Sequence, residues 1–261
     1  MNTNQLNSRR DFVRKLALTG LATCSLPVIG AMAEDSGKSV SSGKRENLVF
    51  LFQGDSITDG NRGRNLDPNH VMGHGYAFSI ASRLGADYPE KKLTFYNRGV
   101  SGNKVTDMEA RWQKDTLDLK PDVLSILVGI NDSASVVFNR PPVVSPEQFE
   151  EVYRSLMDRT KSQFPEVLLV LCNPFNLPVG KVKDNWPAYH ADLEKRQIIV
   201  ARLAEQYHAV FVDFQSVFDK ACKRAAPDYW MWDGVHPTVA GHELMAREWS
   251  KQVGKRLKFV R

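Results

Sequence analysis

Five short apolar runs, separated by longer segments of mixed polarity, constrain the fold of this chain more than any other feature. The runs are nearly continuous in Val, Ile, Leu and Phe, which is typical of parallel strands buried on both faces. They span 48–52, 93–97, 122–128, 167–171 and 209–214, the run at 93–97 being the weakest. Parallel strands need long crossover connections, so the pattern predicts an α/β fold.

The segments between these runs carry helical signals. Ser145 and Pro146 are typical of a helix start, and apolar residues follow at i, i+3, i+4 and i+7 from Phe149. Further helices are expected at 76–88, 105–117, 188–207 and 239–255. Strands that alternate with helices predict a three-layer α/β/α sandwich. No internal repeat is present, and we assign 47–261 to one domain.

The first 33 residues have the layout of an export signal. A polar head and four bases precede an apolar stretch that starts at Leu16. Gly20 and Pro27 interrupt this stretch, which makes it a poor membrane span. The residues at 31–33 read Ala-Met-Ala, an A-x-A cleavage site, and predict that the mature chain starts at residue 34.

The export route has more than one reading. The run 8–12, Ser-Arg-Arg-Asp-Phe, resembles a twin-arginine signal, whose cargo crosses the membrane folded. An ordinary Sec signal is the alternative, and lipidation at Cys24 is weaker because Thr23 precedes it. Residues 34–46 are polar and rich in Gly and Ser, so we expect a flexible leader there. A periplasmic or secreted protein without a stable membrane anchor is predicted.

The charge of the chain belongs largely to this signal. The full chain carries +5, but residues 1–33 contain four of the 35 bases and one of the 30 acids, which leaves +2. A domain so close to neutral lacks the basic surface of a nucleic-acid binder, and we expect no nucleic-acid partner. Two cysteines remain, Cys172 and Cys222, and whether they pair cannot be inferred from sequence.

Polar blocks follow the predicted strands where a parallel sheet binds its ligands, outside the carboxyl ends. They are GDSITD at 54–59, NRGVSGN at 97–103, GIND at 129–132 and, after a further helix, WDGVHP at 232–237. The carboxyl ends of parallel strands meet at one edge of the sheet. The blocks are therefore expected to lie together and to form one site.

These blocks contain what hydrolytic acyl transfer needs. A serine hydroxyl becomes a nucleophile when an imidazole takes its proton, which Ser56 and His236 can provide. Asp233, three residues earlier, can hold the other ring nitrogen. The N–H groups of Ser56 and Gly102 and the side-chain amide of Asn131 can stabilise the oxyanion. We predict a catalytic triad and an oxyanion hole from these five residues.

In these four blocks the chain resembles the SGNH (GDSL-type) hydrolases over nearly all of 47–255. The blocks at 97–103 and 232–242 and the Ala-Arg-Trp at 110–112 look most like its acetylxylan esterase branch. The resemblance implies a flavodoxin-like fold with five parallel strands, no cofactor, and removal of small O-acyl groups from carbohydrate. The first block reads G-D-S-I in place of G-D-S-L, a conservative replacement.

Three further residues are candidate contacts to the substrate. Trp232 adjoins Asp233 and can stack on a sugar ring. Asp55 adjoins the nucleophile, and His74 lies in a long loop at 61–75 that is expected to shape the rim of the pocket. His70 and His74 have a ligand spacing on a helix, but the glycines and the proline around them favour a loop, so no metal is expected.

Two other functions remain open. A lipid or thioester acyl hydrolase would use the same residues, because the triad does not set the length of the acyl chain. A non-catalytic carbohydrate-binding protein of the same fold is the weaker alternative. The expected partner is an acetylated carbohydrate, and a homo-oligomer is a further expectation.

Overall fold

The computed structural model describes residues 46–65 and 67–260. The predicted export signal at 1–33 and all but the last residue of the predicted leader at 34–46 lie outside this range.

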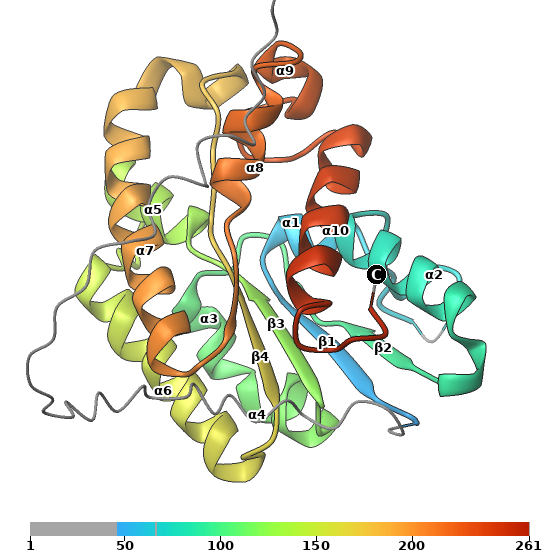
Figure 1. The fold of residues 1–261 in the computed structure, drawn as a ribbon. Helices are drawn as coiled ribbons and strands as arrows, with labels where there is room; N and C mark the ends of the chain where they lie inside the picture. Colours follow the sequence, from blue (N-terminus) through green and yellow to red (C-terminus); the bar gives the residue numbers. More distant parts are fainter. Residues whose placement is uncertain (1–45, 66, 261) are drawn as a thin grey trace, which may run out of the picture. The chain divides into compact units, whose positions relative to one another are not determined.

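A sheet of five parallel strands forms the centre of the domain (Figure 1). Its order is β2-β1-β3-β4-β5, and the register places Phe52 beside both Asn97 and Ser125. The strands are β1 (Val49–Gly54), β2 (Thr94–Asn97), β3 (Val123–Leu127), β4 (Leu168–Cys172) and β5 (Val210–Val212). Each lies within or beside one of the five apolar runs, so the predicted sheet is confirmed.

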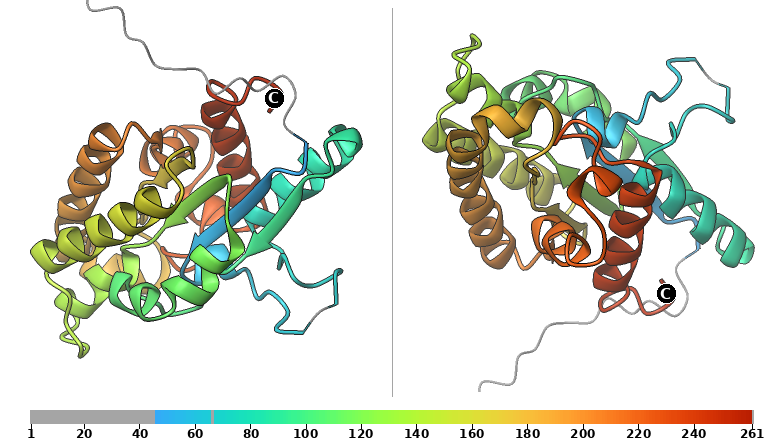
Figure 2. Two further views of the ribbon diagram at one scale, coloured as in Figure 1. Left: turned by 90° about the horizontal axis from the view of Figure 1, so that it is seen from below. Right: turned by 90° about the horizontal axis from the view of Figure 1, so that it is seen from above.

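Helices cover both faces of this sheet (Figures 1 and 2). One core packs the sheet against α2, α8 and α10, and the other packs it against α3, α4 and α6, while α7 contributes to both. The longer helices are α2 (Tyr76–Asp87), α6 (Pro146–Gln163), α7 (Trp186–Gln206) and α10 (Val239–Val253). The shorter ones are α1 (Ser56–Asp59), α3 (Val105–Ala110), α4 (Trp112–Asp115), α5 (Ile130–Val137), α8 (Phe214–Ala221) and α9 (Pro227–Trp230).

The strands alternate their side chains between the two cores, as strand geometry requires. Phe50 and Phe52 are fully buried in the first core, while Leu51 packs in the second. Trp249 of α10 packs against both phenylalanines, with ring centroids 6.3 and 5.5 Å away. This double burial explains why the strands are continuously apolar in sequence.

The helix expected over 105–117 differs from the prediction. It is two helices, α3 and α4, separated at Arg111, whose φ of −113° and ψ of 6° are not helical. The apolar periodicity crosses this break because Met108 and Trp112 still pack in the same core. The helices α1, α5, α8 and α9 were not predicted, since four to eight residues hold too little periodicity to detect.

The structure also describes the state of the two cysteines and the character of the helices. Cys172 and Cys222 are both free thiols, which answers the question that the sequence left open. Within 46–65 and 67–260, no helix has the length and apolar character needed to cross a membrane.

Candidate active site

The candidate nucleophile Ser56 is held at the carboxyl edge of the sheet by a tight turn from β1 into α1. Gly54 ends the strand with a φ of 157°, and a Cβ there would lie 2.3 Å from the carbonyl oxygen of Leu127. Only glycine fits this approach. Asp55 then caps α1, accepting from Ile57 N at 3.0 Å, and Ser56 is the first helical residue. Its own N–H therefore has no acceptor within the helix.

The second part of the site is a compact turn that contains Asp233 and His236. The carboxylate oxygen Oδ1 of Asp233 accepts from the backbone N–H groups of Val235 at 3.0 Å and His236 at 2.8 Å. The other oxygen, Oδ2, lies 2.8 Å from Nδ1 of the His236 ring. Gly180 packs on this turn so closely that a Cβ would lie 2.5 Å from Cα of Asp233. The turn thus fixes both the carboxylate and the ring.

The fold brings this turn to the nucleophile across 180 residues of sequence. Nε2 of His236 lies 2.8 Å from Oγ of Ser56. Because Nδ1–H donates to Asp233, Nε2 carries the lone pair and can accept the serine proton. Ser56, His236 and Asp233 therefore form one hydrogen-bonded chain, in the order that general-base activation of a serine requires.

The charges and hydrogen bonds around His236 stabilise the protonated form of its ring. The hydrogen bond to Asp233 raises the pKa of His236 above 6.5, against the effect of partial burial. Burial acts to raise the pKa of Asp233, but the hydrogen bonds from the side chain and backbone of His236 and from Val235 N outweigh it and lower that pKa. The aspartate stays ionised and the imidazolium is stabilised.

The predicted oxyanion donors follow the three adjacent strands β1, β3 and β2. Gly102 is exposed in a turn that Asn103 N closes on Val100 O at 3.1 Å. Its φ of 83° is the value of the third residue of a type II turn. Asn131 is the second residue of α5, and its Nδ2 donates to Asn103 O at 3.1 Å. Asn103 therefore contacts Asn131 and also closes the turn that contains Gly102.

Comparison with known proteins shows the family to which this chain belongs. The model of the GDSL-like lipase/acylhydrolase family matches residues 52–244, which span all four blocks. The chain belongs to this family. The resemblance seen in the sequence is confirmed, and this GDSL-family protein is a carboxylic ester hydrolase.

Named relatives share most of their length with it. An acetylxylan esterase from Geobacillus stearothermophilus is 35% identical over 81% of this chain and 95% of its own. Its crystal structure superposes with a TM-score of 0.70 at 34% identity, covering 81% of this chain and 97% of that one. A structure of a GDSL-like lipase from Parabacteroides merdae gives a TM-score of 0.77 at 37% identity, covering 82% and 98%. Two solved variants of the Geobacillus enzyme, one with a serine and one with a histidine replaced by alanine, are described as catalytic mutants.

Two of the candidate substrate contacts, Trp232 and His74, are exposed in this GDSL-family protein. The indole ring of Trp232 is stacked on the His236 ring, with centroids 5.7 Å apart and planes 21° apart. Trp232 is 62% exposed, so much of its side chain is accessible to a ligand. His74 is also exposed, and its backbone N–H donates at 3.0 Å to the carbonyl oxygen of Gly60, the residue that follows α1. A contact between His74 and the substrate stays a prediction.

Asp55, the third candidate substrate contact, is too deeply buried to touch a substrate. Its side chain is buried, with the residue only 1% exposed, and one oxygen caps α1. Burial raises the pKa of Asp55 to about 7. Desolvation is the largest cause, and the charge of nearby Asp132 adds to it. Asp55 thus sits beneath the nucleophile rather than at the surface that a substrate can reach.

Two residues that were not among the predicted site residues, Asp59 and Asn97, connect the segment 97–103 to α1. The buried carboxylate of Asp59 accepts from both N and Oγ of Ser101, at 3.0 and 2.9 Å. Asn97 was noted only as part of its block, and its Nδ2 donates to Thr58 O at 2.7 Å. Asp59 lies in the GDSITD block, so its proximity to the nucleophile was visible, but its partner 42 residues away was not.

Across 46–65 and 67–260, no three His, Cys, Asp or Glu side chains gather as a metal would require. His70 lies 3.5 Å from Asp67 in a salt-bridge arrangement, with its side chain 70% exposed.

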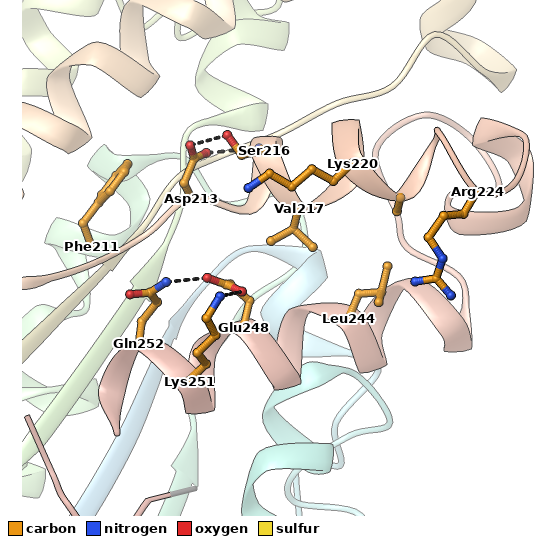
Figure 3. A pocket seen from close by; sticks show the side chains of 11 residues that line it. Phe211, Asp213, Ser216, Val217, Lys220, Arg224, Leu244, Glu248, Lys251 and Gln252 are labelled. Carbon is orange, nitrogen blue, oxygen red and sulfur yellow. Dashed lines mark hydrogen bonds and ion pairs between the residues drawn. The ribbon is translucent and has the colours of Figure 1, made fainter. Parts of the chain in front are cut away.

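A separate groove of about 460 Å³ lies between α8 and α10 (Figure 3). Phe211, Val217 and Leu244 line it together with the bases Lys220 and Arg224. None of its lining residues belongs to the hydrogen-bonded chain of Ser56. The chemistry expected of the family is therefore assigned to the strand ends and not to this groove.

Proposed function

We propose that this protein is a serine esterase that removes O-acetyl groups from carbohydrate through an acetyl-enzyme intermediate. The observation that carries the proposal is the chain of two 2.8 Å contacts from Ser56 through His236 to Asp233. Each contact matches the geometry of general-base activation of a hydroxyl nucleophile.

The first half-reaction transfers the acetyl group to the protein. Oγ of Ser56 attacks the carbonyl carbon of the ester while its proton passes to Nε2 of His236. The tetrahedral intermediate then expels the sugar oxygen, which takes this proton from the imidazolium and leaves as a hydroxyl group. The product at this stage is acetyl-Ser56 with a neutral histidine.

The second half-reaction regenerates the enzyme. A water molecule loses a proton to His236 as it attacks the acetyl carbonyl, and collapse of the second intermediate returns the proton to Ser56 and releases acetate. Asp233 holds the tautomer of His236 throughout. The N–H groups of Ser56 and Gly102 and the amide of Asn131 stabilise both oxyanions.

The substrate class rests on the relative and on the exposed tryptophan. The Geobacillus protein, which this chain matches over 95% of its length, is named an acetylxylan esterase. Trp232 offers a flat, apolar face next to His236, and such a surface suits the apolar face of a pyranose ring. An acetylated polysaccharide or oligosaccharide fits both observations.

The direct test is release of acetate from acetylated xylan by residues 34–261, with Ser56→Ala assayed in parallel. A matched control is Ser82→Ala, since Ser82 is an exposed serine of α2 whose hydroxyl donates to Phe78 O. We expect release by the wild type and by Ser82→Ala and none above background by Ser56→Ala. Release by Ser56→Ala at the wild-type rate contradicts the serine mechanism.

The acyl-length preference separates the two esterase readings. In a series of aryl esters, a sharp preference for acetate supports the carbohydrate function. A preference for chains of roughly six carbons or more indicates the deep apolar pocket of a lipid or thioester hydrolase. Glycan binding without cleavage of any activated ester would instead support a non-catalytic binding protein.

The proposal includes export of the protein from the cytoplasm. The signal-like residues 1–33, with their twin-arginine run and A-x-A site, support a periplasmic or secreted enzyme. Replacing Arg9 and Arg10 by Lys should retain the precursor inside the cell if the twin-arginine route is used, and should leave export intact if the route is Sec. Assembly into a homo-oligomer and the absence of a nucleic-acid partner stay predictions.

A further inference from the structure

Arg111 connects more parts of the candidate site than any residue of the triad does. Its side chain is only 17% exposed and makes five hydrogen bonds. The acceptors are Asn103 Oδ1, Gln53 Oε1 and Arg98 O, each at 2.8 Å, and Asp115 Oδ2 and Gly54 O, each at 3.3 Å. These acceptors lie at the end of β1, directly after β2, in the segment before α3 and at the end of α4.

The break between α3 and α4 occurs at this residue. A single helix over 105–115 would fix Arg111 at a regular helical position, whereas its observed φ and ψ belong to neither helix. Asp115, one turn further along, lies within 3.3 Å of the guanidinium. The irregular backbone thus coincides with an arginine whose side chain reaches the carboxyl end of β1.

One branch of this network leads to the candidate oxyanion hole. Nε of Arg111 donates to the side-chain oxygen of Asn103, and the backbone oxygen of the same Asn103 accepts from Nδ2 of Asn131. The N–H of Asn103 closes the turn that contains Gly102. A shift of Asn103 would therefore move two of the three proposed oxyanion donors together.

A second branch leads to the nucleophile. Nη2 of Arg111 donates to the carbonyl oxygen of Gly54, two residues before Ser56. The same carbonyl oxygen also accepts from Val100 N at 3.0 Å. This bond connects the end of β1, directly before the nucleophile, to the segment that contains Gly102. Arg111 Nη1 also binds Gln53, whose own amide is held by Asp115 O and Thr116 Oγ1 at 2.8 Å each.

We propose that Arg111 is a positioning residue for ester hydrolysis, which acts through Asn103 to align the Gly102 and Asn131 donors with Ser56. The inference rests on the proposed function, since it assigns a role to the same site. Arg111 touches none of the reacting atoms. Its effect is expected in the transition state, where a small displacement of a donor weakens oxyanion stabilisation, and much less in binding of the ground state.

The test uses an aryl acetate and two replacements of Arg111. Arg111→Met removes all five hydrogen bonds, and we expect kcat to fall roughly tenfold to a hundredfold with KM changed by less than about twofold. Arg111→Lys keeps the charge and part of the donor capacity, so its kcat should lie between that of the wild type and that of Arg111→Met. The control is Arg83→Met, since Arg83 pairs with Glu243 on α10 and has no contact with this network; it should keep the wild-type kcat.

A double-mutant cycle separates positioning from a general loss of structure. If Arg111 acts partly through Asn131, then Arg111→Met should cost at least about threefold less in an Asn131→Ala background than in the wild type, since one of the two donors that it aligns is already absent. A merely structural role would lower kcat by the same factor in both backgrounds. Full additivity, or a kcat of Arg111→Met within about twofold of the wild type, overturns the proposal.

A second pair of variants applies if Arg111→Met does not fold. Asn103→Asp keeps an acceptor for Arg111 Nε, whereas Asn103→Leu removes it at similar size. We expect Asn103→Asp to stay within about threefold of the wild-type kcat and Asn103→Leu to lose roughly tenfold or more; equal kcat values for the two would reject the role of Arg111. Ser56→Ala separates the two hypotheses, because its inactivity together with a normal Arg111→Met would keep the esterase function and reject the positioning role.

Discussion

The two turns that form the site, 100–103 and 233–236, are held in different ways. In the turn 233–236, the carboxylate of Asp233 is fixed by the backbone and ring of residues two and three positions away. In the turn 100–103, the support comes from Asp59, Arg111 and the carbonyl of Gly54, all distant in sequence. One turn is largely self-contained, while the other depends on the rest of the fold.

This difference separates two kinds of catalytic contribution. The self-contained turn sets the protonation chemistry, because it determines the tautomer and pKa of His236. The dependent turn sets the position of uncharged donors, whose benefit varies steeply with geometry. Changes at the first turn should therefore alter the pH profile, and changes at the second should alter kcat at every pH.

The largest effect is expected from Asp233→Asn. The amide cannot stabilise the imidazolium and favours the wrong tautomer, so kcat should fall by up to roughly 10⁴-fold. Activity requires neutral His236, whose pKa is raised by Asp233; without this carboxylate the pKa falls, and the acidic limb of kcat/KM moves to lower pH. The pH profile on an aryl acetate measures both effects. Asp118→Asn, at an exposed aspartate, is the control, and an unmoved limb in Asp233→Asn contradicts the assignment.

The next largest effect is expected from Asn131→Ala. Loss of one oxyanion donor should lower kcat by roughly 10²- to 10³-fold, with little change in KM and no shift of the acidic limb. Steady-state kinetics across pH test this contrast with Asp233→Asn. A shift of the limb in Asn131→Ala would show that the two turns do not divide the chemistry in this way.

A smaller effect is expected from Gly102→Ala. No atom lies within 4 Å of a Cβ at this position, but the φ of 83° strains an alanine by about 1 kcal/mol. We expect a loss of about tenfold or less in kcat, which such strain supplies if the turn relaxes in part. Gly180→Ala is the comparison, because the new Cβ would lie 2.5 Å from Cα of Asp233. This variant should lower kcat and also shift the acidic limb, whereas Gly102→Ala should leave the limb in place. Identical pH profiles for the two variants would argue against the separation.

The smallest effect is expected from Asp55→Asn, and it concerns stability. The pKa of Asp55 is raised from 3.8 to about 7 in the folded chain, so folding favours its protonated form. This contribution is fully present below about pH 3.8 and is lost as the pH rises towards 7. Asn cannot ionise, so the melting temperature of the variant should fall less between pH 5 and pH 8 than that of the wild type. Parallel melting curves for the two proteins would contradict the buried, partly protonated state.

The same difference explains what could be predicted from sequence. The proximity of Ser56, Asp233 and His236 could be predicted because each stands in a short block directly after a strand or within one turn, where local spacing is informative. The fold was found because buried parallel strands leave continuous apolar runs. The contacts of Arg111 and Asp59 and the burial of Asp55 depend on segments distant in sequence, so the local motifs that contain these residues do not reveal them. The break at Arg111 was hidden because Met108 and Trp112 keep the helical periodicity across it.

The central claim is tested most directly by trapping the acetyl-enzyme. Rapid acid quenching of the protein during turnover of an aryl acetate, followed by proteolysis and mass spectrometry, should find one acetyl group on the peptide that contains Ser56, located on that serine. The label should be absent from Ser56→Ala. Turnover with no acetylated Ser56, or with the acetyl group on another residue, would contradict the proposed mechanism.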